Sequence, residues 1–133
     1  MPYSFSIFLS FFLSFSILAQ DFKLETRELV DDVIWGMDFL SPREIIFTTR
    51  EGELYKYDLK KNQKTKLKHN LKIKSSGQGG LLDVLVDGAD ILLTYSKPID
   101  KGNITTALYK GELKGNTLEG EDLLVANTLS SKN

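Results

Sequence analysis

The sequence predicts an all-β fold, namely a β-propeller fragment of about two four-stranded antiparallel blades after an N-terminal signal peptide. Three observations support this class: short apolar runs between turn residues, no long stretch with helical periodicity, and an internal repeat of about 45 residues. Apolar residues make up 41% and charged residues 26% of the 133 residues, which is typical of a globular protein. The net charge of −1 gives no electrostatic reason to expect a nucleic-acid partner.

Residues 1–20 differ from the rest of the chain because they carry no charged side chain and are rich in Phe, Leu, Ile and Ser. The apolar stretch from Ile7 to Leu18 is shorter than the roughly twenty residues that a membrane-spanning helix needs. We therefore predict a signal peptide at 1–20, cleaved near Ala19, with a retained anchor as the alternative. The expected location is periplasmic or secreted, without stable membrane insertion after cleavage. The chain has no cysteine, so disulfides cannot stabilise it.

From Asp21 onward, apolar or alternating runs are separated by turn residues such as Ser-Pro, Glu-Gly, Lys-Asn and Asp-Gly. Because these connections are short, neighbouring strands should be antiparallel. In chain order the predicted strands are Val33–Leu40, Glu44–Thr49, Glu53–Leu59, Leu67–Ile73, Leu81–Val86, Ile91–Tyr95, Thr106–Leu113 and Leu123–Ala126.

The second half of the mature region, 21–133, repeats the first. WGMDFLSPREIIFTT lies over GLLDVLVDGADILLT at an offset of about 45 residues, which aligns Asp38 with Asp83. An insertion within Lys97–Thr105 then raises the offset to about 54 and aligns Tyr55 with Tyr109. The repeats, about 33–73 and 80–126, are predicted to be two propeller blades. Because two blades cannot close a ring, we expect a truncated longer protein, with assembly from several chains as the alternative.

Several motifs in this order resemble the opening blades of the soluble quinoprotein glucose/sorbosone dehydrogenases, which include the bacterial aldose sugar dehydrogenases. They are IWGMDFL (34–40), IFTTREG (46–52), GQGGLLDV (77–84), LTYS (93–96) and TALYKGEL (106–113). The chain departs from the family pattern at Ile34, where a proline is common, and at Thr49, where a glutamate is common. It also replaces a longer family loop by a tight turn at Leu85–Gly88.

The resemblance implies a six-bladed propeller that binds pyrroloquinoline quinone (PQQ) and calcium and oxidises aldose sugars at C1 to lactones. It places Gln78 in the cleft for cofactor and substrate. On the residue pattern alone, the glycines around Gln78 would only supply positive φ angles in a loop between blades. The resemblance also implies that the catalytic histidine, the calcium loop and the basic quinone ligands belong to later blades. We therefore assign no catalytic or metal-binding residue in this chain and expect it to be inactive alone.

The alternative function is a non-catalytic secreted propeller that acts as a binding module. His69, the single histidine, lies among lysines and is interpreted as a solvated surface residue rather than a base. The lysine-rich segment Lys60–Lys74 contains no aromatic residue, so it is interpreted as an exposed strand edge and not a nucleic-acid site. The sequence does not indicate whether the chain forms a homodimer.

Other polar and aromatic residues are assigned structural roles. Asp38 and Asp83 are expected to accept hydrogen bonds from the turns of the blades. The acidic pairs and clusters at Asp31–Asp32 and Glu119–Asp122 lack the ligand spacing of a calcium loop. The aromatic residues expected to pack between blades are Trp35, Tyr55, Tyr57 and Tyr109.

Overall fold

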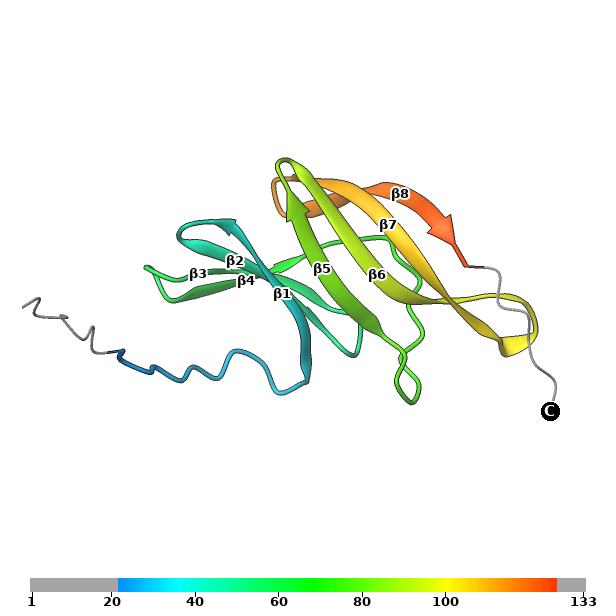
Figure 1. Cartoon of the computed structure of the whole chain (residues 1–133), viewed down its shortest axis with the longest axis horizontal. Helices are drawn as coiled ribbons and strands as arrows, with labels where there is room; N and C mark the ends of the chain where they lie inside the picture. The colour runs from blue at the N-terminus through cyan, green and yellow to red at the C-terminus, as the bar shows by residue number, and fades with distance from the viewer. Residues whose placement is uncertain (1–21, 127–133) are drawn as a thin grey trace, which may run out of the picture.

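The computed structural model of the chain describes residues 22–126 and consists of eight β-strands and one short 3-10 helix (Figure 1). The strands are β1 (Ile34–Ser41), β2 (Glu44–Thr49), β3 (Leu54–Asp58), β4 (Gln63–Leu67), β5 (Leu81–Asp87), β6 (Asp90–Pro98), β7 (Ile104–Lys114) and β8 (Thr117–Val125). The 3-10 helix η1 (Asp100–Gly102) lies between β6 and β7. Among the described residues, no helix has the length and apolar content needed to cross a membrane.

The strands form two separate four-stranded antiparallel sheets in which every strand pairs with its neighbour in sequence. Sheet A has the order β1-β2-β3-β4, and sheet B has the order β5-β6-β7-β8. Figure 1 shows the two sheets side by side, with β1 and β5 in contact at the centre. This arrangement confirms the predicted all-β class and its two blades of four strands.

Strand positions agree with the prediction for β2, whereas β4 and β8 differ from it. β4 consists of Gln63–Leu67 rather than Leu67–Ile73, because its exposed lysines form an edge strand that carries no apolar alternation. β8 begins at Thr117 instead of Leu123. The insertion within Lys97–Thr105 lengthens the hairpin of β6 and β7, so that these strands are longer than β2 and β3.

Two apolar clusters lie on different faces of the sheets. The larger cluster fills the space between the sheets, where Ile46 and Leu54 of sheet A meet Val84 and Leu93 of sheet B. The smaller cluster covers the outer face of sheet A and consists of Ile45, Phe47, Tyr55 and Tyr57, with Leu29 and Val30 packed on it. Tyr109 thus packs between the sheets, as predicted. Tyr55 and Tyr57 instead lie on the outer face of sheet A. Trp35 is half-buried and belongs to neither cluster.

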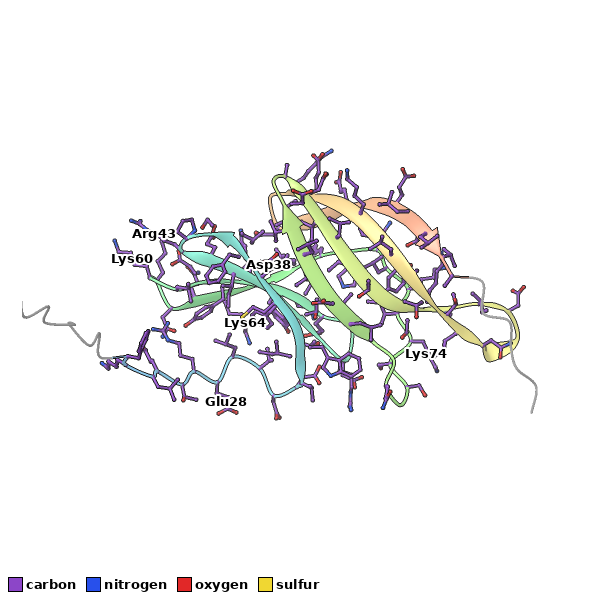
Figure 2. All side chains as sticks on the ribbon, viewed as in Figure 1. Glu28, Asp38, Arg43, Lys60, Lys64 and Lys74 are labelled. Carbon is purple, nitrogen blue, oxygen red and sulfur yellow. The ribbon has the colours of Figure 1, made fainter. Side chains whose placement is uncertain are left out.

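Strands β1 and β5 approach each other so closely that a side chain at Gly36 would not fit. A Cβ atom there would lie 2.6 Å from Asp83 Oδ1 and 2.7 Å from Asp83 Cα. Asp38 lies two residues after Gly36 in β1, and its Oδ2 accepts a hydrogen bond from the Val86 N–H of β5 at 2.7 Å. Figure 2 labels Asp38 at this junction between the sheets. Asp38 therefore accepts hydrogen bonds from strand backbone, at Phe39 of its own strand and at Val86 of sheet B, and not from a turn as predicted.

The strand register corrects the alignment of the two repeats. In each sheet the first strand carries a bulge near its start, after which Gly36 pairs with Thr48 and Asp83 pairs with Thr94. Gly36 is therefore equivalent to Asp83, whereas the sequence alignment matched Asp83 with Asp38. The alignment of Tyr55 with Tyr109 is confirmed, because Phe47 pairs with Tyr55 and Leu93 pairs with Tyr109 at the same ladder position.

The core of sheet B contains a buried tyrosine that is hydrogen-bonded to a carboxylate. Tyr95 donates its hydroxyl proton to Asp122 Oδ1 at 2.8 Å, and Asp122 also pairs with Lys97. Burial and this hydrogen bond to the Asp122 carboxylate raise the pKa of Tyr95 well above its ordinary value. The folded state thus favours the neutral phenol.

We predict that the stability difference between the parent chain and Tyr95→Phe depends on pH. At pH 7 the variant should lose about 1–3 kcal/mol, because Asp122 loses a hydrogen bond. Above about pH 10 the unfolded parent ionises at this residue while the folded parent does not, so the parent loses stability that the variant retains. Urea unfolding measured from pH 7 to pH 11 should therefore show that the difference in free energy of unfolding between the parent chain and Tyr95→Phe becomes smaller as the pH rises. A difference that stays constant over this range would contradict the assignment.

Candidate functional site

The glycine-rich loop Ser75–Gly80 joins sheet A to the first strand of sheet B. After β4 the chain runs beside the far edge of sheet B, where Lys68 N–H donates to the Asn116 carbonyl and Leu118 N–H donates to the Lys68 carbonyl, both at 2.8 Å. Leu71 and Ile73 of this segment then pack against the larger apolar cluster. The segment reaches β5 through the loop, which projects beyond the strand ends in Figure 1. The loop therefore lies at the end of the molecule where β2 ends and β3 begins.

Each glycine of the loop has a different reason to lack a side chain. Gly80 has φ +155°, and a Cβ atom there would lie 2.1 Å from the Arg50 carbonyl oxygen. A Cβ atom on Gly79 would lie 3.0 Å from Ser96 Oγ. Gly77 has φ +58° and open space around it, so its role is conformational. The glycines thus supply positive φ and also allow close backbone packing.

Ser96 of β6 fixes both ends of the loop through its backbone. Lys74 N–H donates to the Ser96 carbonyl at 2.9 Å, and Ser96 N–H donates to the Gly80 carbonyl at 2.8 Å. Within the loop, Gly79 N–H donates to the Ser76 carbonyl at 2.8 Å and closes a turn. Figure 2 labels Lys74 at the base of the loop. These bonds make a fixed base from which Gln78 projects, exposed to solvent.

A polar cluster connects this base to sheet A. Ser75 Oγ donates to Glu51 Oε2 at 2.9 Å, and the guanidinium of Arg50 pairs with Glu51 Oε1 at 3.0 Å. The Glu51 N–H in turn donates to Asp32 Oδ2 at 3.2 Å. The turn between β2 and β3 is thereby linked both to the loop and to the segment that precedes β1.

Asp32 is ionised in this cluster. Desolvation by burial opposes the charge, but hydrogen bonds from Thr49, Val33 and Glu51 outweigh it and lower the pKa of Asp32 below its ordinary value. Its Oδ1 accepts the Val33 N–H at 2.6 Å. The carboxylate thus satisfies backbone donors and has a structural role, which agrees with the absence of calcium-loop spacing at Asp31–Asp32.

The side chain of Gln78 is exposed to solvent. Its amide offers N–H donors and a carbonyl acceptor. The space around Gly77 is open, whereas Gly79 is packed against Lys74, Ser76 and Ser96. The sequence identified this loop, but it missed Ser96 and Arg50, whose backbone atoms hold the loop from distant parts of the chain.

The structure does not bring His69 to Gln78. The His69 ring is half-buried, and its Nε2 lies 2.9 Å from the Gly52 carbonyl oxygen, while Nδ1 is buried without a partner among the described residues. The prediction of a solvated surface histidine is therefore wrong, because the ring packs against the turn between β2 and β3. The lysines of β4, Lys64 and Lys66, are exposed on the edge strand as predicted.

Within residues 22–126, no group of three or more His, Cys, Asp or Glu side chains is placed to hold a metal ion. These residues therefore do not form a calcium site among themselves. For PQQ, the exposed Gln78 amide beside side-chain-free glycines fits one polar contact to a planar ligand.

A family model described as Glucose / Sorbosone dehydrogenase matches residues 31–133. Among solved structures, the soluble aldose sugar dehydrogenase from Escherichia coli in its apo-form is similar, with a TM-score of 0.66 and 28% identity. A glucose dehydrogenase structure has a TM-score of 0.64 at 25% identity, and another has 0.66 at 24%.

These structural matches cover 77%, 69% and 71% of this chain, but only 32%, 29% and 32% of the respective relatives. The chain therefore spans about a third of the length of the sugar dehydrogenases that it resembles. No curated protein matches the chain.

We predict that Gly80→Ala destabilises the chain more than Gly77→Ala. A methyl group at Gly80 would collide with the Arg50 carbonyl, so the loss should be about 2 kcal/mol or more. At Gly77 the space is open, and only the positive φ opposes alanine, by about 1–2 kcal/mol. The urea midpoint measures both effects. If the two midpoints shifted equally, the close packing of the loop on Arg50 would be refuted.

Proposed function

The chain belongs to the glucose/sorbosone dehydrogenase family, and we propose that its two sheets are blades of an exported, PQQ-dependent sugar dehydrogenase. In this proposal the loop Ser75–Gly80 faces the substrate cleft, and Gln78 contacts the sugar or the cofactor. The observation that carries the proposal is the exposed amide of Gln78 on a base fixed by Ser96. The similarity to a glucose dehydrogenase and an aldose sugar dehydrogenase supports aldoses as the substrate class.

The proposed reaction converts the C1 hydroxyl of an aldose into the carbonyl of a lactone. A hydride leaves C1, and a proton leaves the C1 hydroxyl for a base. PQQ, when bound, supplies the hydride acceptor. The role of Gln78 is orientation: its N–H donates to a sugar hydroxyl while its carbonyl accepts from another. The fixed loop base limits the movement of this amide, which keeps the cost of ordering it low.

The proposed base and the calcium ligands lie outside residues 22–126. His69 is bound to the Gly52 carbonyl and is not a candidate base. The described residues supply no three-ligand acidic group for calcium, so no step is assigned to that ion here. The two sheets alone are therefore proposed to be inactive, and activity requires further blades. The proposed location is the periplasm or the outside of the cell.

We predict that Gln78 determines the activity of a chimera. In it, residues 22–126 replace the matched segment of the Escherichia coli aldose sugar dehydrogenase, which is 28% identical. With PQQ and calcium, the chimera should reduce a dye when aldose is added, and Gln78→Ala should lower kcat/KM by about 10- to 100-fold, the range of one lost transition-state hydrogen bond or more. The matched control is Gln63→Ala, on the exposed edge strand β4, which should leave kcat/KM unchanged.

Two results would contradict the proposal in different ways. If Gln78→Ala behaved like Gln63→Ala in an active chimera, Gln78 would not contact sugar or cofactor. If a folded chimera bound PQQ but showed no aldose-dependent reduction, the loop of this chain would not be that of a sugar dehydrogenase.

A further inference from the structure

A polar hollow lies between the two sheets, at the β8 edge of sheet B, and has a volume of about 470 Å³. One wall is the segment that follows β4, at Asn70–Lys72, and the other wall consists of residues from β6, β7 and β8. Tyr95 and Tyr109 of this second wall belong to the apolar cluster between the sheets, so the hollow lies on the inner face of sheet B. The further blades of the proposed function would meet the outer faces and therefore do not occupy this space.

Backbone hydrogen bonds fix the two walls of the hollow relative to each other. Lys68 N–H donates to the Asn116 carbonyl and Leu118 N–H donates to the Lys68 carbonyl, which holds the start of the segment beside β8. Lys74 N–H donates to the Ser96 carbonyl at 2.9 Å, which holds the end of the segment beside β6. Because both walls are anchored, a ligand would bind here without first having to order them.

Tyr109 lines this hollow with an unpaired hydroxyl group. The residue is only 3% exposed, and its hydroxyl oxygen is buried without a hydrogen-bond partner within residues 22–126. Its ring lies over Gly111, where a Cβ atom would be 2.9 Å from Tyr109 Cε1. A buried phenol hydroxyl normally has a partner, because burial removes its hydrogen bonds to water. The Tyr109 hydroxyl therefore keeps both its donor and its acceptor capacity for a ligand.

A carboxylate of fixed orientation lies beside this hydroxyl. Asp122 of β8 is the ladder partner of Tyr109. Its Oδ1 accepts the Tyr95 hydroxyl at 2.8 Å, and its Oδ2 pairs with the Lys97 ammonium group. Burial and the negative charges of Asp122 and Glu119 raise the pKa of Tyr109, so its hydroxyl stays protonated. The hollow thus combines a neutral donor, a carboxylate acceptor and an ammonium donor.

The charges around the hollow are balanced, which indicates an uncharged ligand. Lys72 and Lys97 supply two positive charges, and Glu121 and Asp122 supply two negative charges. An anion would meet the carboxylates and a cation would meet the ammonium groups, and either approach is unfavourable. Asn70 adds an amide that both donates and accepts hydrogen bonds. Ligand hydroxyl groups, which also donate and accept, match this set of partners.

The size and the apolar lining of the hollow restrict the ligand further. Its volume of about 470 Å³ lies within the range of roughly 300–1,000 Å³ that is typical of small-molecule sites. Leu71 and Pro98 add apolar surface to the polar groups. A pyranose sugar has the corresponding form, because hydroxyl groups surround its rim while C–H groups cover its faces.

From these observations we infer that this hollow binds a neutral, hydroxyl-rich molecule of monosaccharide size. Tyr109 donates to one hydroxyl of the ligand, and Asp122 accepts from another. Leu71 and Pro98 contact its C–H groups. The hollow shares no residue with the loop Ser75–Gly80, so it is a second site, separate from the proposed cleft. It depends neither on PQQ nor on sugar oxidation.

Isothermal titration calorimetry of the purified chain, without PQQ, tests this inference. D-glucose, D-galactose and myo-inositol are the neutral probes, and at least one of them should bind more tightly than inorganic phosphate. Tyr109→Phe removes only the hydroxyl and should weaken that binding by about 3- to 10-fold, the effect of one neutral hydrogen bond. Because this hydroxyl makes no hydrogen bond in the part of the chain that the structure describes, the variant should keep the circular dichroism of the parent.

Two control variants and one further lining variant locate the binding. Tyr57→Phe removes a hydroxyl on the outer face of sheet A and should leave the affinity unchanged. Gln78→Ala alters the loop and should also leave it unchanged. Asn70→Ala alters an exposed residue of the hollow and should weaken binding like Tyr109→Phe.

Three results would overturn the inference. The first is that none of the neutral probes binds the parent chain at up to about 100 mM, or that inorganic phosphate binds more tightly than they do. The second is equal affinity of the parent and Tyr109→Phe for the probe that binds. The third is binding that Gln78→Ala abolishes and Tyr109→Phe retains, which would support the proposed role of Gln78 while refuting this second site.

Discussion

The structure depends on the close approach of β1 and β5, because this contact buries one face of each sheet. Gly36 makes the approach possible, since a side chain at that position would meet the backbone of Asp83. Asp38 then ties the strands together by accepting the Val86 N–H. A four-stranded sheet with apolar residues on both faces needs cover on both; the β1–β5 contact covers the inner faces, and Leu29 and Val30 pack on the outer face of sheet A. The outer face of sheet B keeps exposed apolar side chains, among them Leu85 and Leu124.

The fold class could be predicted from the sequence because turns and alternating runs mark strands directly. β2 was predicted correctly, since apolar residues from Ile45 to Phe47 lie between clear turns. β4 was not, because an exposed edge strand rich in lysine has no buried face to impose alternation. The repeat was found at the wrong register, since β1 has a second register shift, between Phe39 and Ser41, that β5 lacks and that leaves no mark in the apolar pattern. Asp38 and Asp83 looked equivalent for that reason.

The candidate site was predictable in part. The glycines around Gln78 identified the loop, because positive φ and close packing both exclude side chains. The partners that hold the loop are backbone atoms of Arg50 and Ser96, and no residue type signals a backbone contact made from so far along the chain. His69 was misjudged for a related reason: lysine neighbours indicated solvent, whereas the turn at Gly52 provides a partner for its ring.

One engineered disulfide tests the packing of sheet A on sheet B most directly. The chain has no cysteine, so Asp38→Cys with Val86→Cys introduces a single defined pair. Because the Asp38 side chain reaches the Val86 backbone, air oxidation should link this pair within one chain. Asp38→Cys with Leu85→Cys is the matched control, since Leu85 points to the outer face and should not link. Equal cross-linking of the two pairs, or none at all for the first, would contradict the arrangement of adjacent blades.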